Sequence, residues 1–205
     1  CTHDSGIAVV RVRAWNIFEK KFGIPFPLMG VGLLWHMWRE VRRAEVVHVH
    51  DVFYMTSWAA YLFARAYRRP IILTQHVAMV EHTSALVMHV QRVVYATFGT
   101  LLFRGARTVI VYNENVRNFL LTYGVLPTNI RLIHNGIDTT LYHPATDVTE
   151  KREMRQLFGL PEDRPLALFV GRFVPKKGFD VVYGARDPAY DLVFAGSGDF
   201  PEEWK

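Results

Sequence analysis

Short β-rich runs alternate with helical patterns over most of the chain, and this alternation constrains the fold more than any other feature. The runs are Val46–Val49, Pro70–Thr74, Thr108–Val111 and Ile130–Ile133. Apolar residues at helical spacing fill the intervals between them. Strands joined through helices form parallel sheets, and functional groups in such folds lie at the carboxyl ends of the strands. The pattern therefore predicts an α/β protein with a parallel, doubly wound sheet.

Two further elements are expected in the first half of the chain. The β-rich run Ile7–Val12 predicts a buried strand, and a long amphipathic helix is expected over about Ser84–Phe103. The most apolar part of that helix, Val93–Phe103, is bounded by Arg92 and Arg104. We expect this part to be too short to cross a bilayer, which takes about 20 residues.

A change of composition marks a second domain. The segment Asp138–Glu153 is polar and charged, and two predicted strands follow it, Leu166–Val170 and Asp191–Ala195. Two strands do not form a stable open sheet by themselves. We therefore predict a Rossmann-like lobe over residues 1–144, lacking its first strand, and the beginning of a second lobe over residues 145–205. The chain starts without methionine, so we expect a piece cut at both ends.

A glycine-rich and cationic loop follows the first strand of this second domain. The run Leu166–Val170 opens onto Gly171 and Arg172, and Lys177 and Gly178 precede a helical pattern. Strand, glycine, cationic loop and helix occur in this order in phosphate-binding sites of α/β proteins. The alternative is a solvated basic loop without a ligand.

Three ordered motifs in this region resemble those of the family-4 glycosyltransferases. They are Ile133–Asp138 (IHNGID), Leu141–Pro144 (LYHP) and Val170–Gly178 (VGRFVPKKG). His134 stands where proline is commoner in the family, and Tyr142 where phenylalanine is commoner. Each motif alone is a weak signal, but three in this order and spacing are specific. The resemblance covers most of the chain and implies the GT-B fold, in which two Rossmann-like lobes face each other across a cleft.

The resemblance also implies an activity. Enzymes of this family transfer a hexosyl unit from a nucleotide-sugar donor to an acceptor hydroxyl, and here retention of configuration and independence of metal ions are expected. The donor would be UDP- or GDP-linked and is a substrate, so no cofactor is expected. The acceptor would be a sugar, a lipid-linked molecule or another small molecule. We expect this chain alone to be inactive, because the family's E-x7-E pair does not occur before Lys205; no Asp-x-Asp metal clamp occurs either.

Donor-site residues follow from the resemblance. Arg172 and Lys177, next to Gly171, would contact the diphosphate and stabilise its charge as the glycosidic bond breaks. Gly196 and Gly198 would let the backbone approach the nucleotide. The alternative for these two glycines is that they simply end the preceding strand.

A second group of candidates follows the strands of the first lobe. His76 comes just after the Pro70–Thr74 strand, where the family has a histidine near the donor sugar; a structural histidine is the alternative. His48 and His50 would share one face of the preceding strand, because side chains alternate with period two. Two histidines without a third ligand make a poor metal site, so no metal is expected. His50 and Asp51 would instead line the acceptor cleft.

The charge of the chain bears on its partners. A net charge of +5 and an isoelectric point near 9.4 favour anionic partners. Solvated helix ends are expected to carry Arg39, Arg42, Arg43, Arg65, Arg68 and Arg69. The alternative is contact with an anionic membrane, which would suit a lipid-linked acceptor. The single cysteine, Cys1, excludes a disulfide framework, and we expect a cytoplasmic protein, with a peripheral position at the membrane as the alternative.

Two other classes of function stay open at this point. A GT-B relative such as a sugar-nucleotide epimerase would share the lobes but need its own acid and base residues. A non-catalytic basic module would bind membrane or nucleic acid with a strong dependence on salt. The sequence has no stacked-aromatic or recognition-helix motif, so a nucleic-acid partner is not expected.

Overall fold

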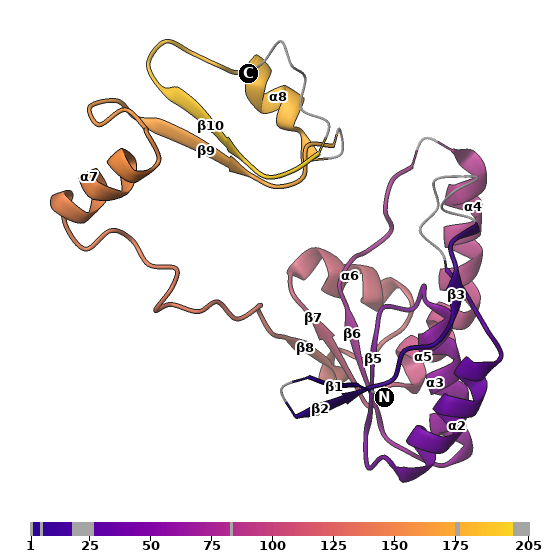
Figure 1. The fold of residues 1–205 in the computed structure, drawn as a ribbon. Coiled ribbons are helices and arrows are strands. Elements are labelled where there is room, and N and C mark those ends of the chain that lie inside the picture. The colour runs from indigo at the N-terminus through magenta and orange to yellow at the C-terminus, as the bar shows by residue number, and fades with distance from the viewer. Residues whose placement is uncertain (1, 5, 18–26, 83, 175–176, 199–205) are drawn as a thin grey trace. The chain divides into compact units, whose positions relative to one another are not determined.

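The computed structural model of the protein describes residues 2–4, 6–17, 27–82, 84–174 and 177–198 (Figure 1). The chain divides into two compact units, residues 1–136 and residues 137–205. Each unit has its own parallel sheet with helices in the connections. The predicted α/β class is therefore confirmed.

A four-stranded parallel sheet forms the centre of the first unit. Its strands are β5 (Val47–His50), β6 (Ile71–Gln75), β7 (Thr108–Val111) and β8 (Ile130–Leu132), in that spatial order. The register pairs His50 with Thr74 and Gln75 with Val111. The carboxyl ends of β5, β6 and β7 therefore lie side by side, at the edge where the candidate histidines were expected.

Helices connect these strands. They are α2 (Gly32–Arg43), α3 (Met55–Ala66), α4 (Ala85–Val94), α5 (Thr100–Gly105) and α6 (Glu114–Thr122), with a π-helical turn over Tyr95–Gly99 and a 3-10 turn over Pro127–Asn129. Figure 1 shows α2 and α3 packed beside each other. The start of α6 is capped by Asn113, whose side chain accepts the Val116 N–H at 2.9 Å. This bond satisfies a backbone donor that has no partner within the helix.

The hydrophobic core lies between the sheet and these helices. The strands supply the buried residues Val47, Val49, Ile71, Leu73, Val109 and Val111. The helical segments supply Tyr95, Leu102, Phe103, Val116 and Leu120, each at most 2% exposed. Burying one large apolar side chain stabilises a fold by about 1.5–3 kcal/mol, so this cluster holds the strand ends of the first unit in place.

Ala85–Gly105 is a continuous helical stretch of 21 residues, which confirms the long helix predicted over about Ser84–Phe103. By length and composition it is able to cross a membrane, contrary to the expectation drawn from its most apolar part. A core helix of a globular protein passes the same test, and Tyr95, Leu102 and Phe103 of this stretch pack in the core. Length and composition are therefore weak evidence for a membrane span here.

The first residues form short antiparallel pairs. β1 (Thr2–Asp4) pairs with β2 (Ile7–Val9), and β3 (Ala14–Trp15) pairs with β4 (Leu28–Met29). The expectation of a buried strand over Ile7–Val12 is wrong, since Ile7 is 68% exposed. β2 pairs only with β1 in a two-stranded sheet, and a sheet of this size has too small an apolar face to bury its side chains by itself. An apolar run indicates a strand but does not show what covers it.

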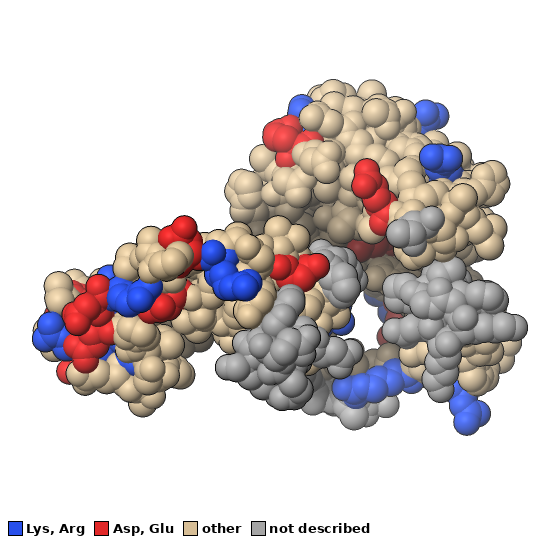
Figure 2. Space-filling view, turned by 90° about the horizontal axis from the view of Figure 1, so that it is seen from above, with Lys and Arg blue, Asp and Glu red and all other residues tan. Residues whose placement is uncertain are grey.

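The second unit contains two helices and a two-stranded sheet within the described residues. They are α7 (Val148–Leu157), β9 (Leu166–Val170), α8 (Phe179–Gly184) and β10 (Asp191–Ala195). β9 and β10 are parallel and in register over their whole length. Figure 2 shows acidic and basic side chains intermixed over α7, which buries none of its residues. The predicted order of strand, helix and strand in this region is confirmed.

Candidate functional site

Three histidines gather at the carboxyl edge of the first sheet, and we call them the histidine cluster: His48, His50 and His76. His50 Nδ1 and His76 Nε2 are 3.0 Å apart and form a hydrogen bond. The rings of His48 and His50 are 4.5 Å apart, as expected for side chains two residues apart on one strand. The structure therefore brings together two residues that the sequence assigned to separate roles, one near the donor sugar and one in the acceptor cleft.

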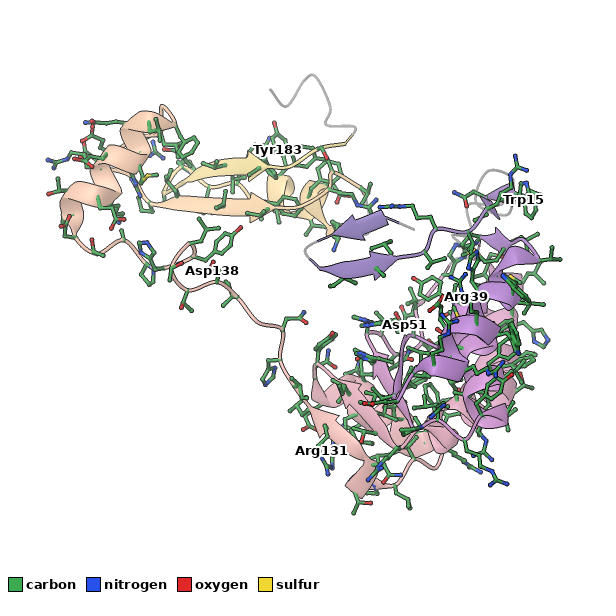
Figure 3. The ribbon with its side chains drawn as sticks, turned by 60° about the horizontal axis from the view of Figure 1, so that its bottom comes forward. Trp15, Arg39, Asp51, Arg131, Asp138 and Tyr183 are labelled. Carbon is green, nitrogen blue, oxygen red and sulfur yellow. The ribbon has the colours of Figure 1, made fainter. Side chains whose placement is uncertain are left out.

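Asp51, which Figure 3 labels, fixes the position of His76. Its carboxylate Oδ1 accepts the backbone N–H of His76 at 2.9 Å, and its own N–H donates to the Thr74 carbonyl at 2.9 Å. Asp51 is held at φ +53°, in the left-handed region, which costs a non-glycine residue about 1–2 kcal/mol. The two hydrogen bonds offset that cost. Asp51 thus acts on the histidine cluster by holding the chain that carries His76.

The elements behind the cluster hold it further. Ser57 of α3 donates its hydroxyl to the His50 carbonyl at 3.0 Å. The buried side chain of Gln75 donates to the Val77 carbonyl at 2.8 Å and thereby shapes the turn that contains His76. These contacts connect the core to the cluster. The backbone segments that carry His50 and His76 are therefore themselves held by hydrogen bonds.

Sequence reasoning missed two members of this site. The hydroxyl Oγ1 of Thr74 lies 2.8 Å from His48 Nε2, and the ring of Tyr112 lies 5.0 Å from that of His76. Tyr112 follows β7 directly, so the rule that placed His76 at the end of β6 could also have found it. Thr74 could not have been found in that way, because its contact depends on the pairing register of β5 and β6.

The electrostatics of the edge disfavour a positive charge on His48. Partial burial lowers the pKa of His48, and the neighbouring His50 and His76 lower it further. Burial raises the pKa of Tyr95 above its ordinary value, and the negative charge of Asp51 adds to that rise. In a neutral imidazole one nitrogen carries the proton and the other accepts a hydrogen bond. With both rings neutral, the hydrogen-bonded pair His50–His76 offers a ligand one donor and one acceptor at its two outer nitrogens.

The glycines of the second unit are explained by the close approach of two loops. Gly171 N–H donates to the Ala195 carbonyl at 3.0 Å, which extends the β9–β10 ladder beyond both strands. A Cβ on Gly196 would stand 1.8 Å from the Gly171 carbonyl oxygen, and one on Gly198 would stand 2.8 Å from the Phe173 oxygen. Gly198 also has φ +136°. Packing within the protein thus requires glycine at both positions before any nucleotide is considered.

The cations of the loop after β9 are exposed. Among the described residues, neither the Arg172 guanidinium nor the Lys177 ammonium has a hydrogen bond or an ion pair. Gly178, at φ +69°, turns the chain into α8. Lys176, also in this motif, lies outside the described residues. Arg172 and Lys177 are thus free to contact an anion.

The predicted site residues fall into two sets, one in each unit. His50, Asp51 and His76 meet at the edge of the first sheet, and the donor-site glycines and cations flank the ends of β9 and β10. Over the part of the chain that the structure describes, no group of three or more His, Cys, Asp or Glu side chains is arranged to hold a metal ion.

The turn after the first unit is also ordered by a carboxylate. Asp138 Oδ1 accepts both the N–H of Thr140 at 2.9 Å and its hydroxyl at 2.6 Å. The hydroxyl bond, followed by the backbone bonds, lowers the pKa of Asp138. The aspartate of the IHNGID motif therefore has a conformational role in the turn itself.

Comparison with known proteins gives one family and several relatives. A family model described as Glycosyltransferase Family 4 matches residues 3–141. D-inositol 3-phosphate glycosyltransferase of Mycobacterium bovis is 26% identical over 168 residues, which cover 76% of this chain and 34% of the relative. Glycogen synthase of a Hydrogenobaculum species is 41% identical over 90 residues, covering 33% of this chain and 19% of the relative. The chain thus spans about a third or less of the length of these relatives.

Solved structures show the same fold. HepE of Anabaena, determined in complex with UDP, superposes with a TM-score of 0.64 at 17% identity, covering 84% of this chain and 45% of HepE. Together with the parallel sheets of both units, this likeness confirms the α/β fold class, of the GT-B type, that was expected from the sequence.

Proposed function

Because the chain belongs to Glycosyltransferase Family 4, we propose that the protein transfers a hexosyl unit from a nucleotide sugar to a hydroxyl group of an acceptor. The observation that carries the proposal is a pair of cations, Arg172 and Lys177, that lack a partner within the described part of the chain and lie on a glycine-bounded loop after a parallel strand. A diphosphate leaving group gains negative charge as the glycosidic bond breaks. Fixed cations at that position stabilise the transition state more than the ground state.

Relatives support a nucleotide-sugar donor. HepE of Anabaena has been solved with UDP and also with UDP-glucose, and D-inositol 3-phosphate glycosyltransferase is named as a glycosyl-transferring enzyme. We propose a UDP- or GDP-linked hexose as the donor. A sugar-nucleotide epimerase is not favoured, because the family match and both relatives point to glycosyl transfer.

The histidine cluster and Asp51 give the proposed contacts to the donor sugar and to the acceptor. His76 would orient the donor sugar, and His50 and Asp51 would line the acceptor cleft. The outer nitrogens of the His50–His76 pair provide one donor and one acceptor, which is the set that a sugar hydroxyl satisfies. A sugar, a lipid-linked molecule or a small molecule would present such a hydroxyl.

Three finer features form part of the proposal. Retention of anomeric configuration follows the family, and proton NMR of the first product formed would check it.

Transfer without a metal ion is expected because two cations would take the place of a metal clamp. Activity that survives a chelator would agree with this expectation, and activity restored only by a divalent cation would contradict it. We further propose a cytoplasmic location.

Calorimetric titration with UDP and with GDP tests the donor site. We expect one nucleotide to bind, and Arg172→Ala and Lys177→Ala each to weaken its affinity roughly 10- to 100-fold, as expected for lost hydrogen bonds to a charged group. Lys151→Ala, which removes an exposed lysine from α7 of the same unit, is the matched control and should leave binding unchanged. Binding that ignores both loop substitutions would reject the donor site.

A further inference from the structure

Four arginines line one pocket of the first unit, and we call it the arginine pocket: Arg65, Arg68, Arg69 and Arg107. Its volume is about 560 Å³, and its other lining residues are Ala64, Pro70, Ile71 and Gly105. Ala64 and Arg65 lie at the end of α3, and Gly105 ends α5. The other lining residues lie just before β6 or β7 or, for Ile71, at the start of β6. The pocket therefore lies at the amino-terminal edge of the sheet, opposite the edge that carries the histidine cluster.

Backbone hydrogen bonds hold the pocket in shape. The N–H of Arg69 donates to the Ala64 carbonyl at 2.8 Å and closes the end of α3, and the N–H of Arg107 donates to the Ile71 carbonyl at 2.8 Å. Arg68 occupies the left-handed position of this helix end, at φ +53°. Glycine is the usual residue at such a position, because any side chain is strained there. The chain thus carries a cation where glycine would be more stable.

The charge of the pocket is not balanced by the protein. None of the lining residues is acidic. The side chains of Arg65, Arg68 and Arg107 have no hydrogen bond or ion pair within the described residues, and Glu40 on the adjacent α2 is engaged by Arg39 at 2.6 Å. Like charges that converge on one pocket repel each other unless an anion joins them.

One buried donor of a lining residue also lacks a partner. Arg69 Nη2 donates to the Arg42 carbonyl at the end of α2 at 2.7 Å, but Arg69 Nε is buried and has no hydrogen-bond acceptor among the residues that the structure describes. A buried donor without an acceptor costs free energy, so a ligand oxygen there would remove a penalty as well as add a contact. The guanidinium group matches phosphate oxygens in geometry and charge.

From these observations we propose that the arginine pocket binds a ligand through a phosphate or diphosphate group. The ligand would be either a free phosphorylated small molecule or the phosphate of an anionic lipid headgroup. The pocket belongs to the first unit, whereas the proposed donor diphosphate would be held by Arg172 and Lys177 of the second. The inference therefore does not depend on the proposed function.

Pyrophosphate is the probe for the first source. It is titrated calorimetrically into the chain carrying Arg172→Ala and Lys177→Ala, so that the loop after β9 contributes no binding. We expect the added pair Arg65→Gln and Arg107→Gln to weaken binding roughly tenfold or more. The pair Arg92→Gln and Arg117→Gln removes the same charge from α4 and α6, outside the pocket, and should change affinity less than twofold on the same scale.

Vesicles are the probe for the second source. Cosedimentation is compared between phosphatidylcholine alone and an equimolar mixture with phosphatidylglycerol. If the anionic vesicles bind the parent chain, and only the pair Arg65→Gln and Arg107→Gln (the pocket pair) abolishes this binding, the ligand is a lipid headgroup. An effect of the pocket pair on pyrophosphate alone would assign it to a free phosphate compound. The proposal is overturned if the pocket pair and the control pair weaken the binding of both probes to the same extent. It is also overturned if neither probe binds.

Arg68→Gly separates binding from folding. The substitution relieves the left-handed strain, so we expect a higher melting temperature together with weaker binding of the probe that the parent chain binds. If Arg68 only ends the helix, the substitution would raise the melting temperature without weakening the binding of the probe. A stabilised Arg68→Gly variant with unchanged affinity would therefore overturn the proposal as well.

Discussion

At the carboxyl edge of the first sheet the candidate site residues bind one another, whereas the cations of the loop after β9 do not. His50 and His76 hydrogen-bond to each other and Asp51 holds the backbone of His76. Arg172 and Lys177 have no such partners among the described residues. The first arrangement is preorganised and will change little when a ligand arrives. The second needs an anion to complete it, so substitutions there should alter binding far more than stability.

The comparison is sharpest at the glycines, where the loops after β9 and β10 pack closely although Arg172 and Lys177 have no partner in the described part of the chain. Gly196→Ala places a Cβ 1.8 Å from the Gly171 carbonyl, and backbone cannot yield to that extent without opening the β9–β10 ladder. We expect a loss of about 4 kcal/mol or more, enough to unfold the second unit. Amide NMR signals of residues 166–195 would collapse while those of the first sheet persist.

Gly184→Ala is the control for that substitution. The position lies at the end of α8 in the same unit, has open space for a Cβ, and has no left-handed backbone. We expect no loss of stability from it. Native signals from β9 and β10 in the Gly196→Ala protein would show that the two loops do not need their close approach.

The second largest effect is expected at Asp51, which tests how the histidine edge is held. Asp51→Ala removes the acceptor of the His76 N–H and leaves a residue poorly suited to φ +53°, so we expect a loss of about 2 kcal/mol. Asp51→Asn keeps an acceptor oxygen and tolerates the left-handed region, and should cost about half as much or less. Urea unfolding of the two variants measures the difference, and equal losses would show that the hydrogen bond contributes little.

The smallest effect concerns the protonation of the histidine cluster. The folded pKa of His48 is lowered by burial and by its neighbours, so below the ordinary histidine pKa of about 6.5 the unfolded chain binds more protons than the folded chain. The free energy of unfolding should therefore fall as the pH drops through this range and level off below the folded pKa.

Urea midpoints above and below about pH 6.5 would measure this dependence. His48→Gln should flatten it, whereas His89→Gln, which changes an exposed histidine of α4, should not. An unchanged slope in His48→Gln would mean that other groups set the pH dependence of the first unit.

Much of the fold follows from local sequence, and the exceptions have identifiable causes. The strands at Val47–His50 and Thr108–Val111 match their β-rich runs closely, because each run is bounded by helical segments. The run Ile7–Val12 failed because the same composition suits a buried strand and an exposed hairpin. The helix Ala85–Gly105 agrees with the one predicted over about Ser84–Phe103, but the expectation that it is too short to cross a membrane was wrong because it considered only the most apolar part, Val93–Phe103.

The site divides in the same way. Positions at strand ends, such as His50 and His76, could be predicted because topology fixes which edge carries them. Their mutual hydrogen bond could not, since it depends on the register that sets His50 opposite Thr74. The arginine pocket was equally hidden, because Arg107 stands far from Arg65 in sequence and joins it only when β6 and β7 pair.

The hydrogen bond between His50 and His76 has one more consequence. A proton taken up at the outer nitrogen of one ring can be matched by transfer across the 3.0 Å contact and by release from the outer nitrogen of the other ring. Charge then crosses the length of two imidazoles while every heavy atom stays in place. The pair thus has the geometry that a short proton wire requires, and either of its ends could serve as the entrance.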